Sequence, residues 1–155
     1  MEARKAIDSF TTMNELVLPN DTNTFGDLMG GKLMYWMDIA AYLAASKHCN
    51  SAAMTASVDN LSFKTPIKLG NVICIEARVT RSFTTSMEIH LKVWNQNMIS
   101  QTRELSNEAF FTFVALDENK KPKQVPAIIA ESEEEKKFYD SALRRRQLRL
   151  ILAGK

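Results

Sequence analysis

Asp38 is the first residue in this sequence whose surroundings suggest chemistry. It lies within GDLMGGKLMYWMDIAAYLAA, residues 26–45, as the single acid in the apolar run that follows Lys32. Burying an unpaired carboxylate costs on the order of several kcal/mol, so this side chain needs either a partner or a task. A carboxylate can activate water as a general base or attack an acyl group as a nucleophile. The pattern therefore indicates Asp38 as a candidate for one of these two roles.

Two tyrosines offer the same carboxylate a purely structural role. Tyr35 and Tyr42 lie on either side of Asp38 at helical spacing, three residues before it and four after it. Side chains at these spacings share one face of a helix. A hydroxyl from either tyrosine would satisfy a buried acid. From the residues alone, both roles of Asp38 stay open.

Two glycines stand at the predicted start of the same helix. The first N–H groups of a helix have no partner within it, and Gly30 and Gly31 in MGGK would let a substrate approach those groups closely. The glycines also suit a tight entry into the helix. Gly31 and Asp38 are seven positions apart, about 10 Å along a helix axis, so one carbonyl cannot touch both. A loop or a second subunit is needed to close that gap.

The same stretch also comes close to a phosphate-binding loop. Residues 26–32 have the spacing G-x-x-x-x-G-K, which would indicate a nucleotide hydrolase. Leu33 stands where that motif needs Ser or Thr for magnesium, and no alternation of parallel strands and helices follows. The sequence therefore disfavours a nucleotide hydrolase.

Hydrophobic periodicity predicts the elements that hold these residues. One long helix runs from Gly31 to about Lys47, since strong helix formers continue there without a further Gly or Pro. A short strand in MNELVL precedes the helix. Four runs with apolar residues at every second position follow it, in AAMTASVDNLSFKTP, NVICIEARVTRSF, SMEIHLKVWNQ and EAFFTFVALDEN. In the first run Met54, Ala56 and Val58 form the apolar side, and turn residues between the runs predict an antiparallel sheet.

A second helix is predicted in the tail ESEEEKKFYDSALRRRQLRLIL. Ser132 and Glu135 form a capping box at its start, and acids precede bases along it, as the helix dipole favours. The basic end suits either solvent or a nucleotide phosphate, and its arginines are Arg144, Arg145, Arg146 and Arg149. Because the central helix is apolar on all sides, it must be enclosed. We therefore expect a curved sheet around it, with an edge or a face left for another subunit.

Three stretches resemble the hot-dog fold acyl-CoA thioesterases, in the subgroup of bacterial acyl-CoA hydrolases related to the animal cytosolic acyl-CoA hydrolase. They are PNDTNTFGDLMGGKLMYWMDIAAYLAASKHCN, ASVDNLSFKTPIKLGNVICIEARVTRSFTTSMEIHLKVW and EAFFTFVALDENKKPKQVP, within residues 14–126. The resemblance implies an α+β hot-dog domain over residues 1–130, in which a five- to six-stranded antiparallel sheet wraps one long central helix. Residues 131–155 would form a C-terminal helical extension.

The resemblance also implies an activity and its residues. The expected reaction converts acyl-CoA and water to free CoA and a fatty acid, without a metal or any cofactor beyond the CoA of substrate and product. Asp38 in WMD would be the catalytic acid, as general base or nucleophile. Asn23 in DTNTFGD would polarise the thioester carbonyl together with the backbone amide of Gly31, and Gly30 would lie against the substrate. Asn23 also suits an ordinary turn.

The resemblance places these active sites between subunits. We expect a homo-oligomer, either a dimer or a trimer of dimers (a hexamer), in which Asn23 of one chain serves Asp38 of another. The turn TRSFTTSME is a candidate for contact with the CoA carrier. Its guanidinium and hydroxyl groups suit a phosphate-rich ligand and equally suit a polar hairpin, and they belong to Arg81, Thr84, Thr85 and Ser86.

Two alternatives within the same fold stay open, an acyl-CoA-binding protein without turnover and a hot-dog dehydratase. Dehydration generally requires a histidine near the helix as part of an acid/base pair. Of the two histidines, His48 is expected at the C-terminal end of the helix and His90 on a strand facing solvent. Neither is expected to be catalytic.

Composition limits the remaining classes of function. The 155 residues carry 20 Lys and Arg against 18 Asp and Glu, a net charge of +2, which argues against nucleic acid or a membrane surface as partner. No run of apolar residues is long enough for a membrane span, and the first residues lack a signal sequence. Cys49 and Cys74 form no disulfide framework, which favours a cytoplasmic location, and no histidine has a zinc-like spacing.

Overall fold

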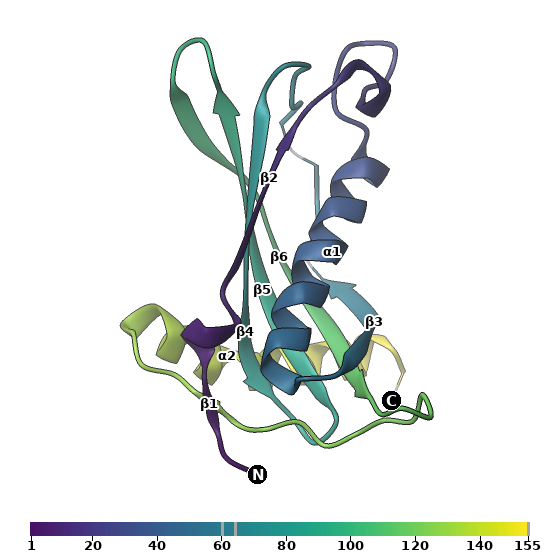
Figure 1. Ribbon diagram of the computed structural model, residues 1–155, viewed down its shortest axis with the longest axis vertical. Helices are drawn as coiled ribbons and strands as arrows, with labels where there is room; N and C mark the ends of the chain where they lie inside the picture. Colours follow the sequence, from purple (N-terminus) through teal and green to yellow (C-terminus); the bar gives the residue numbers. More distant parts are fainter. Residues whose placement is uncertain (60, 64, 155) are drawn as a thin grey trace.

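A strongly curled antiparallel sheet wraps one long helix in the computed structural model, which describes residues 1–59, 61–63 and 65–154 (Figure 1). The sheet has five strands in the order β2-β4-β5-β6-β3, so β2 and β3 form its edges. The strands are β2 (Thr11–Leu16), β3 (Ala52–Asp59), β4 (Val72–Ser82), β5 (Ser86–Asn97) and β6 (Thr102–Leu116). Their order and direction agree with the predicted α+β hot-dog architecture.

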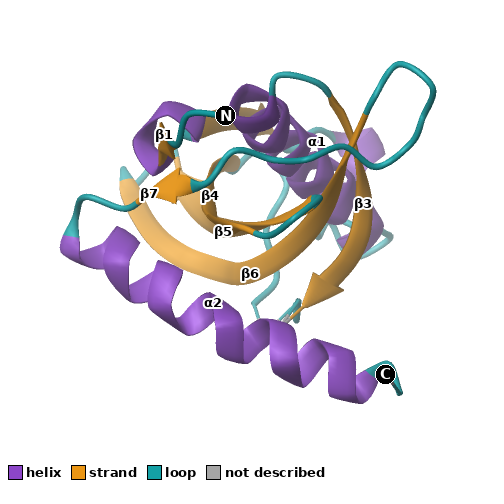
Figure 2. Ribbon diagram, turned by 90° about the horizontal axis from the view of Figure 1, so that it is seen from below, coloured by secondary structure: helices purple, strands orange, loops and turns teal. Residues whose placement is uncertain are grey.

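The central helix α1 (Gly30–Cys49) lies in the concave side of the sheet (Figure 2). It extends a residue or two beyond the predicted range at each end, and Asn50 stops it in the left-handed conformation, with φ 54°. Four alanines on its buried side allow the backbone to approach the strands closely, and they are Ala40, Ala41, Ala44 and Ala45. The core between helix and sheet is closed by Leu33, Trp36 and Met37 from the helix and by Ile73, Ile75, Met87, Ile89, Leu91, Phe111 and Phe113 from the strands.

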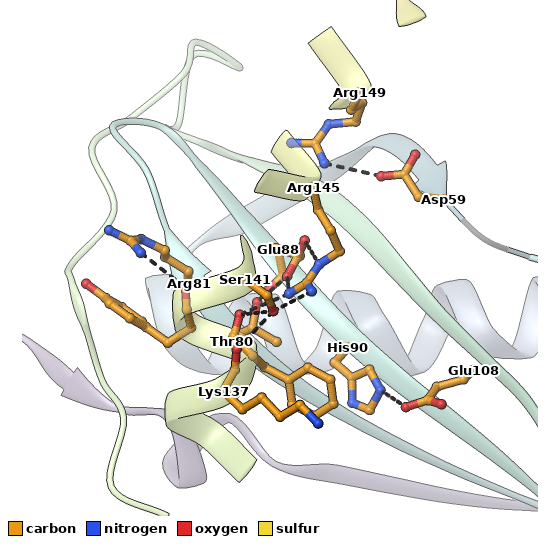
Figure 3. A network of polar contacts seen from close by, with 12 residues as sticks. Asp59, Thr80, Arg81, Glu88, His90, Glu108, Lys137, Ser141, Arg145 and Arg149 are labelled. Atoms are coloured by element: carbon orange, nitrogen blue, oxygen red, sulfur yellow. Dashed lines mark hydrogen bonds and ion pairs between the residues drawn. The ribbon is translucent and has the colours of Figure 1, made fainter. Parts of the chain in front are cut away.

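The second helix, α2 (Glu133–Leu152), crosses the convex face of the sheet (Figure 2). The predicted capping box is present, because the Ser132 side chain accepts from the backbone of Glu135 and the Glu135 side chain accepts from the backbone of Ser132. Midway along α2, the Arg145 guanidinium donates to both oxygens of the buried Glu88 carboxylate, at 2.9 and 2.7 Å (Figure 3). The sheet therefore packs against α1 on its concave face and against α2 on its convex face.

Several short elements were not anticipated from the sequence. Strands β1 (Arg4–Lys5) and β7 (Ile128–Ile129) form a parallel pair, and short 3-10 helices cover Ala6–Ser9 and Pro19–Asp21. The division at residue 130 stays a prediction. In the described part of the chain, no helix is both long and apolar enough to cross a membrane.

The face assignment of β3 differs from the prediction. Met54 and Ala56 face outward, and Met54 is 53% exposed. Thr55 points instead toward α1, since it donates to a side chain of that helix. The physical reason is a register shift between Thr55 and Ser57, where β3 bulges against β6. After the bulge Val58 packs against the core as expected.

Candidate active site

The carboxylate of Asp38 meets a hydroxyl of the edge strand. Asp38 lies in the middle of α1 and is half-buried, and Thr55 Oγ1 of β3 donates to its Oδ1 at 2.7 Å. The alternative left open by the sequence, a hydrogen bond from Tyr35 or Tyr42 to this acid, is not present among the described residues. Both tyrosines point toward solvent, with exposed fractions of 59% and 38%. The carboxylate is thus held in place by Thr55 while part of it stays accessible.

Apolar side chains surround this carboxylate on the outside of the single chain. Met34 and Tyr42, which lie four residues before and after Asp38 on the helix, are both exposed, and so is Leu43. The helix expected to be enclosed on all sides is therefore covered by its own chain on one side only. Exposed apolar patches of this kind are typical of protein interfaces.

The start of α1 presents free backbone donors. Met29 precedes the helix without a side-chain cap, and its carbonyl accepts the N–H groups of Lys32 and Leu33. Among the described residues, the N–H groups of Gly30 and Gly31 have no hydrogen-bond partner. In the described part of the chain, a Cβ on Gly31 would meet no atom within 4 Å beyond its chain neighbours and the backbone of its own helix. Open space at an uncapped helix start is a ready site for an anion or a carbonyl oxygen.

Asn23 lies in the loop that leads into this helix start. Its Oδ1 accepts the backbone N–H groups of Phe25 at 2.9 Å and Asp27 at 3.2 Å, so the predicted turn role is confirmed. These two bonds orient the side chain such that its NH₂ group is left to donate elsewhere. Asn23 is exposed and does not contact Asp38 of its own chain within the described residues. One chain thus supplies Asn23 and Gly31 at one end of α1, and Asp38 two turns further on.

The turn between β4 and β5 lies at the opposite end of α1. Pro126 links this turn to the C-terminal end of α1, because its carbonyl accepts from Ser82 Oγ at 2.6 Å and from His48 Nε2 at 2.7 Å. The backbone carbonyls of Thr84 and Thr85 accept from Val125 and Ala115. A 20-residue helix spans about 30 Å. Within one chain the structure therefore does not bring this turn to Asn23 and Gly31.

Arg81 and Ser86 take part in this turn in different ways. The Arg81 guanidinium donates to the Tyr139 carbonyl of α2 at 3.1 Å and stacks over the Tyr139 ring at 4.1 Å. The carbonyl of Ser86 accepts from the N–H of Phe83 across the hairpin. Arg81 thus helps to attach α2, and the exposed hydroxyl of Thr84 is the group of this turn most accessible to a ligand.

Both histidines are buried, which corrects the expectation for His90. His90 was expected to face solvent, but it is 4% exposed because α2 covers it, and its ring stacks on Phe138 with centroids 4.2 Å apart. Its Nε2 donates to Glu108 at 2.6 Å (Figure 3). Burial lowers the pKa of His90, against the raising effect of Glu108. Burial likewise lowers the pKa of His48, which is fixed by Pro126.

Three of the four arginines of α2 contact other parts of the chain, so the prediction of a solvated basic end holds only for Arg144. Arg145 binds Glu88, and Arg149 forms an ion pair with Asp59 at the end of β3, at 3.2 Å (Figure 3). Arg146 lies over the Phe83 ring at 4.9 Å. Only Arg144 among the four is exposed. These groups hold α2 on the sheet.

Thr55 is the site residue that sequence reasoning missed. The alternation of Met54, Ala56 and Val58 placed it on the outer face, because a bulge cannot be read from a period of two. The available signal was a threonine in the strand directly after the helix, where a β-branched hydroxyl can reach an acid on that helix. The site as observed comprises Asp38 with Thr55, and separately Asn23 with Gly31.

Comparison with known proteins identifies the family. The family model of the thioesterase superfamily matches residues 25–100. The acyl-CoA thioester hydrolase YkhA of Bacillus subtilis is 40% identical over 144 residues, which cover 93% of this chain and 84% of that protein. A crystal structure of an apo-hexameric acyl-CoA thioesterase superposes with a TM-score of 0.95 at 40% identity, covering 99% of this chain and 98% of the other.

A third relative has been solved with ligands. The acyl-CoA hydrolase of Staphylococcus aureus, in complex with butyryl-CoA, CoA and CoA disulfide, superposes with a TM-score of 0.88 at 35% identity, covering 97% of this chain and 94% of the other. That enzyme has also been solved with an asparagine, an aspartate and a threonine each replaced by alanine. The helix enclosed by a curled sheet, the coverage and the identity agree with one another, and the chain belongs to the thioesterase superfamily, among its hot-dog acyl-CoA thioesterases.

Proposed function

We propose that this protein hydrolyses acyl-CoA thioesters to free CoA and fatty acids. The observation that carries the proposal is the Asp38–Thr55 pair, a carboxylate fixed at 2.7 Å by a hydroxyl and accessible from an apolar surface. Such a carboxylate can take a proton from water as the water attacks the thioester carbonyl. Direct attack by Asp38, giving an acyl-carboxyl anhydride that water then opens, is the second route.

The sequence separations between Asn23, Asp38 and Thr55 support this assignment. In the S. aureus hydrolase, the asparagine, aspartate and threonine replaced by alanine are separated by 15 and 17 positions. Asn23, Asp38 and Thr55 have the same separations in this chain. This agreement supports the proposal that Asn23, Asp38 and Thr55 belong to one active site.

A second copy of the chain would close the gap between those halves. The carbonyl oxygen would lie against the free N–H of Gly31 and the NH₂ group of Asn23, which strengthen their hydrogen bonds as negative charge develops on that oxygen. Asp38 of the other chain would face the carbonyl carbon. The unpaired edge of β3 and the exposed apolar side of α1 are the surfaces available for such an association.

The number of subunits and the CoA contacts are parts of the same proposal. A hexamer is proposed because the relative with a TM-score of 0.95 is hexameric. The turn of Thr84, Thr85 and Ser86, with Arg81 beside it, is proposed to meet the CoA of a neighbouring subunit, because it lies far from Gly31 of its own chain. Gly30 as a substrate contact, the absence of metal and cofactor, and the cytoplasmic location stay predictions.

The experiment is an assay of thiol release from acyl-CoAs of several chain lengths, for the wild-type protein and for Asp38→Asn. We expect turnover by the wild-type protein and a loss of about 10²- to 10⁴-fold in kcat for the variant, because Asn cannot accept the proton. Equal rates would reject the role of Asp38. Binding of acyl-CoA by the wild-type protein without thiol release would support the alternative of a non-catalytic acyl-CoA-binding protein. A dehydratase is disfavoured because His48 is buried against Pro126.

A further inference from the structure

The two glycines at the start of α1 differ in what surrounds them. Gly31 faces open space, whereas a Cβ on Gly30 would come within 3.1 Å of Cε2 of the Phe63 ring. Such a contact is tighter than most Cβ contacts, so the ring would have to give by a few tenths of an ångström. Gly30 therefore lets Phe63 lie close against the helix start. The ring thus lies against the residue directly before Gly31, whose N–H has no hydrogen-bond partner among the described residues.

Phe63 is unusual for an aromatic residue in this position. It packs on the helix start, yet 54% of it stays exposed. A ring that served only the core would be expected to bury most of its surface, since each Å² of apolar area removed from water contributes about 25 cal/mol. More than half of the ring thus stays open at the start of α1, where it lies against Gly30, the residue before Gly31.

Hydrogen bonds fix the segment that carries the ring. The side chain of Asn107, a buried residue of β6, donates to the Ser62 carbonyl directly before Phe63. Further along, the backbone of Leu28 donates to the Ile67 carbonyl at 2.7 Å. Ser62, directly before Phe63, is thus anchored to the sheet, and Ile67 is anchored to the loop before α1.

We infer that Phe63 forms the apolar wall of the thioester subsite, in contact with the methylene group bonded to the thioester sulfur. This inference rests on the proposed function, because it assumes that the carbonyl oxygen lies against Gly31 N–H. A ring in that place would exclude water from the oxygen, which strengthens the hydrogen bonds from the backbone donors. The group that the wall meets is common to all acyl-CoAs, so its contribution should not depend on chain length.

The test compares Phe63→Ala and Phe63→Leu with Ile99→Ala, which removes a 95% exposed apolar side chain at the tip of the β5–β6 hairpin. For acyl-CoAs from acetyl to lauroyl, we expect Phe63→Ala to lower kcat/KM at least about tenfold by a similar factor at every length. Phe63→Leu should retain most of the activity, and Ile99→Ala all of it. A loss confined to long chains would contradict the inference, as would unchanged activity of Phe63→Ala.

The Gly30→Ala variant tests the same contact without removing the Phe63 ring. Its Cβ should push the Phe63 ring aside by a few tenths of an ångström and lower activity, without lowering the melting temperature, because Ala favours the helix. In the double variant Gly30→Ala/Phe63→Ala the Cβ has room, so the activity should equal that of Phe63→Ala alone. Additive losses would instead mean that Gly30 itself contacts the substrate, and would overturn the account of Gly30. A wild-type protein that releases no thiol would reject the proposed function. The Phe63 and Gly30 variants test only the role of Phe63, because their activities are compared with that of the wild-type protein.

Discussion

Thr55 of the edge strand donates a hydrogen bond to Asp38 of the central helix, at 2.7 Å. This is the contact that joins β3 to the carboxylate in the middle of α1. It fixes the orientation of the carboxylate and leaves Oδ2 for a further partner. A hydroxyl in this position serves the reaction only through the acid that it positions.

Replacing Thr55 by Val removes the hydroxyl and keeps the shape of the side chain. Because a hydrogen bond to a charged group contributes about 1.5–3 kcal/mol, we expect kcat to fall by about 10- to 100-fold. Thr55→Ser keeps the donor and should retain most of the activity. The measurement is the steady-state kcat of both variants. An equal kcat for Thr55→Val and Thr55→Ser would count against the positioning role of Thr55.

Replacing Gly31 by Ala separates stability from activity. No atom lies within 4 Å of the new Cβ, and Ala is favoured over Gly in a helix by up to about 1 kcal/mol. The melting temperature should therefore stay the same or rise. Thiol release should fall at least about tenfold, because the methyl group occupies the approach to the free N–H. A fully active variant would mean that no carbonyl binds there.

Replacing Arg145 by Met tests how α2 is held on the sheet. Glu88 is 1% exposed, so the variant leaves its carboxylate buried, with Thr80 as its remaining donor. Removing one partner of a buried ion pair costs about 3–5 kcal/mol. Urea unfolding should show a loss of that size. The matched control is Arg144→Met, at the exposed neighbouring position, and a similar loss in that variant would contradict the interpretation.

The buried histidines predict sensitivity to acid. Burial lowers the pKa of His90 from its ordinary value of 6.5, while Glu108 and Glu134 raise it and Lys92 lowers it further. As the pH falls through 6.5, the unfolded chain therefore binds a proton at this histidine that the folded chain does not yet bind. The contribution of His90 to the free energy of unfolding is thus full above pH 6.5 and is lost as the pH falls. His48 acts in the same direction, since burial also lowers its pKa.

The measurement is the free energy of unfolding between pH 7.5 and 5. We expect wild-type stability to decrease below pH 6.5, and the decrease to be smaller in His90→Phe, which keeps an aromatic ring against Phe138 but cannot be protonated. The remaining slope should come from His48. Parallel curves for the two proteins would contradict a contribution from His90.

The fold could be anticipated because each main element has a strong local signal. Helix formers without breakers define α1, apolar alternation defines β4, β5 and β6, and a capping box defines the start of α2. What the sequence could not reveal depends on contacts between distant elements. The bulge that turns Thr55 inward comes from pairing of β3 with β6, and the burial of His90 comes from packing of α2 on the convex face.

The site was anticipated only in part for a related reason. Asp38 stands out because it is a single acid in an apolar helix, and the glycines stand out by their position. Asn23 could not be told from a turn residue, and the structure shows that it is one as well. Its proposed role depends on an NH₂ group without a hydrogen-bond partner among the described residues, which no local pattern encodes.

The central claim is that the active site is shared between two chains, and mixing inactive variants tests it most directly. Asn23→Ala and Asp38→Ala chains are each unfolded, combined and refolded together, with each variant refolded alone as control. A mixed dimeric unit would contain one site with both Asn23 and Asp38 intact, so random pairing should restore about a quarter of the wild-type thiol release per chain. Mass spectrometry of differently tagged chains shows whether mixed oligomers form. If they form and stay inactive, the shared active site is contradicted.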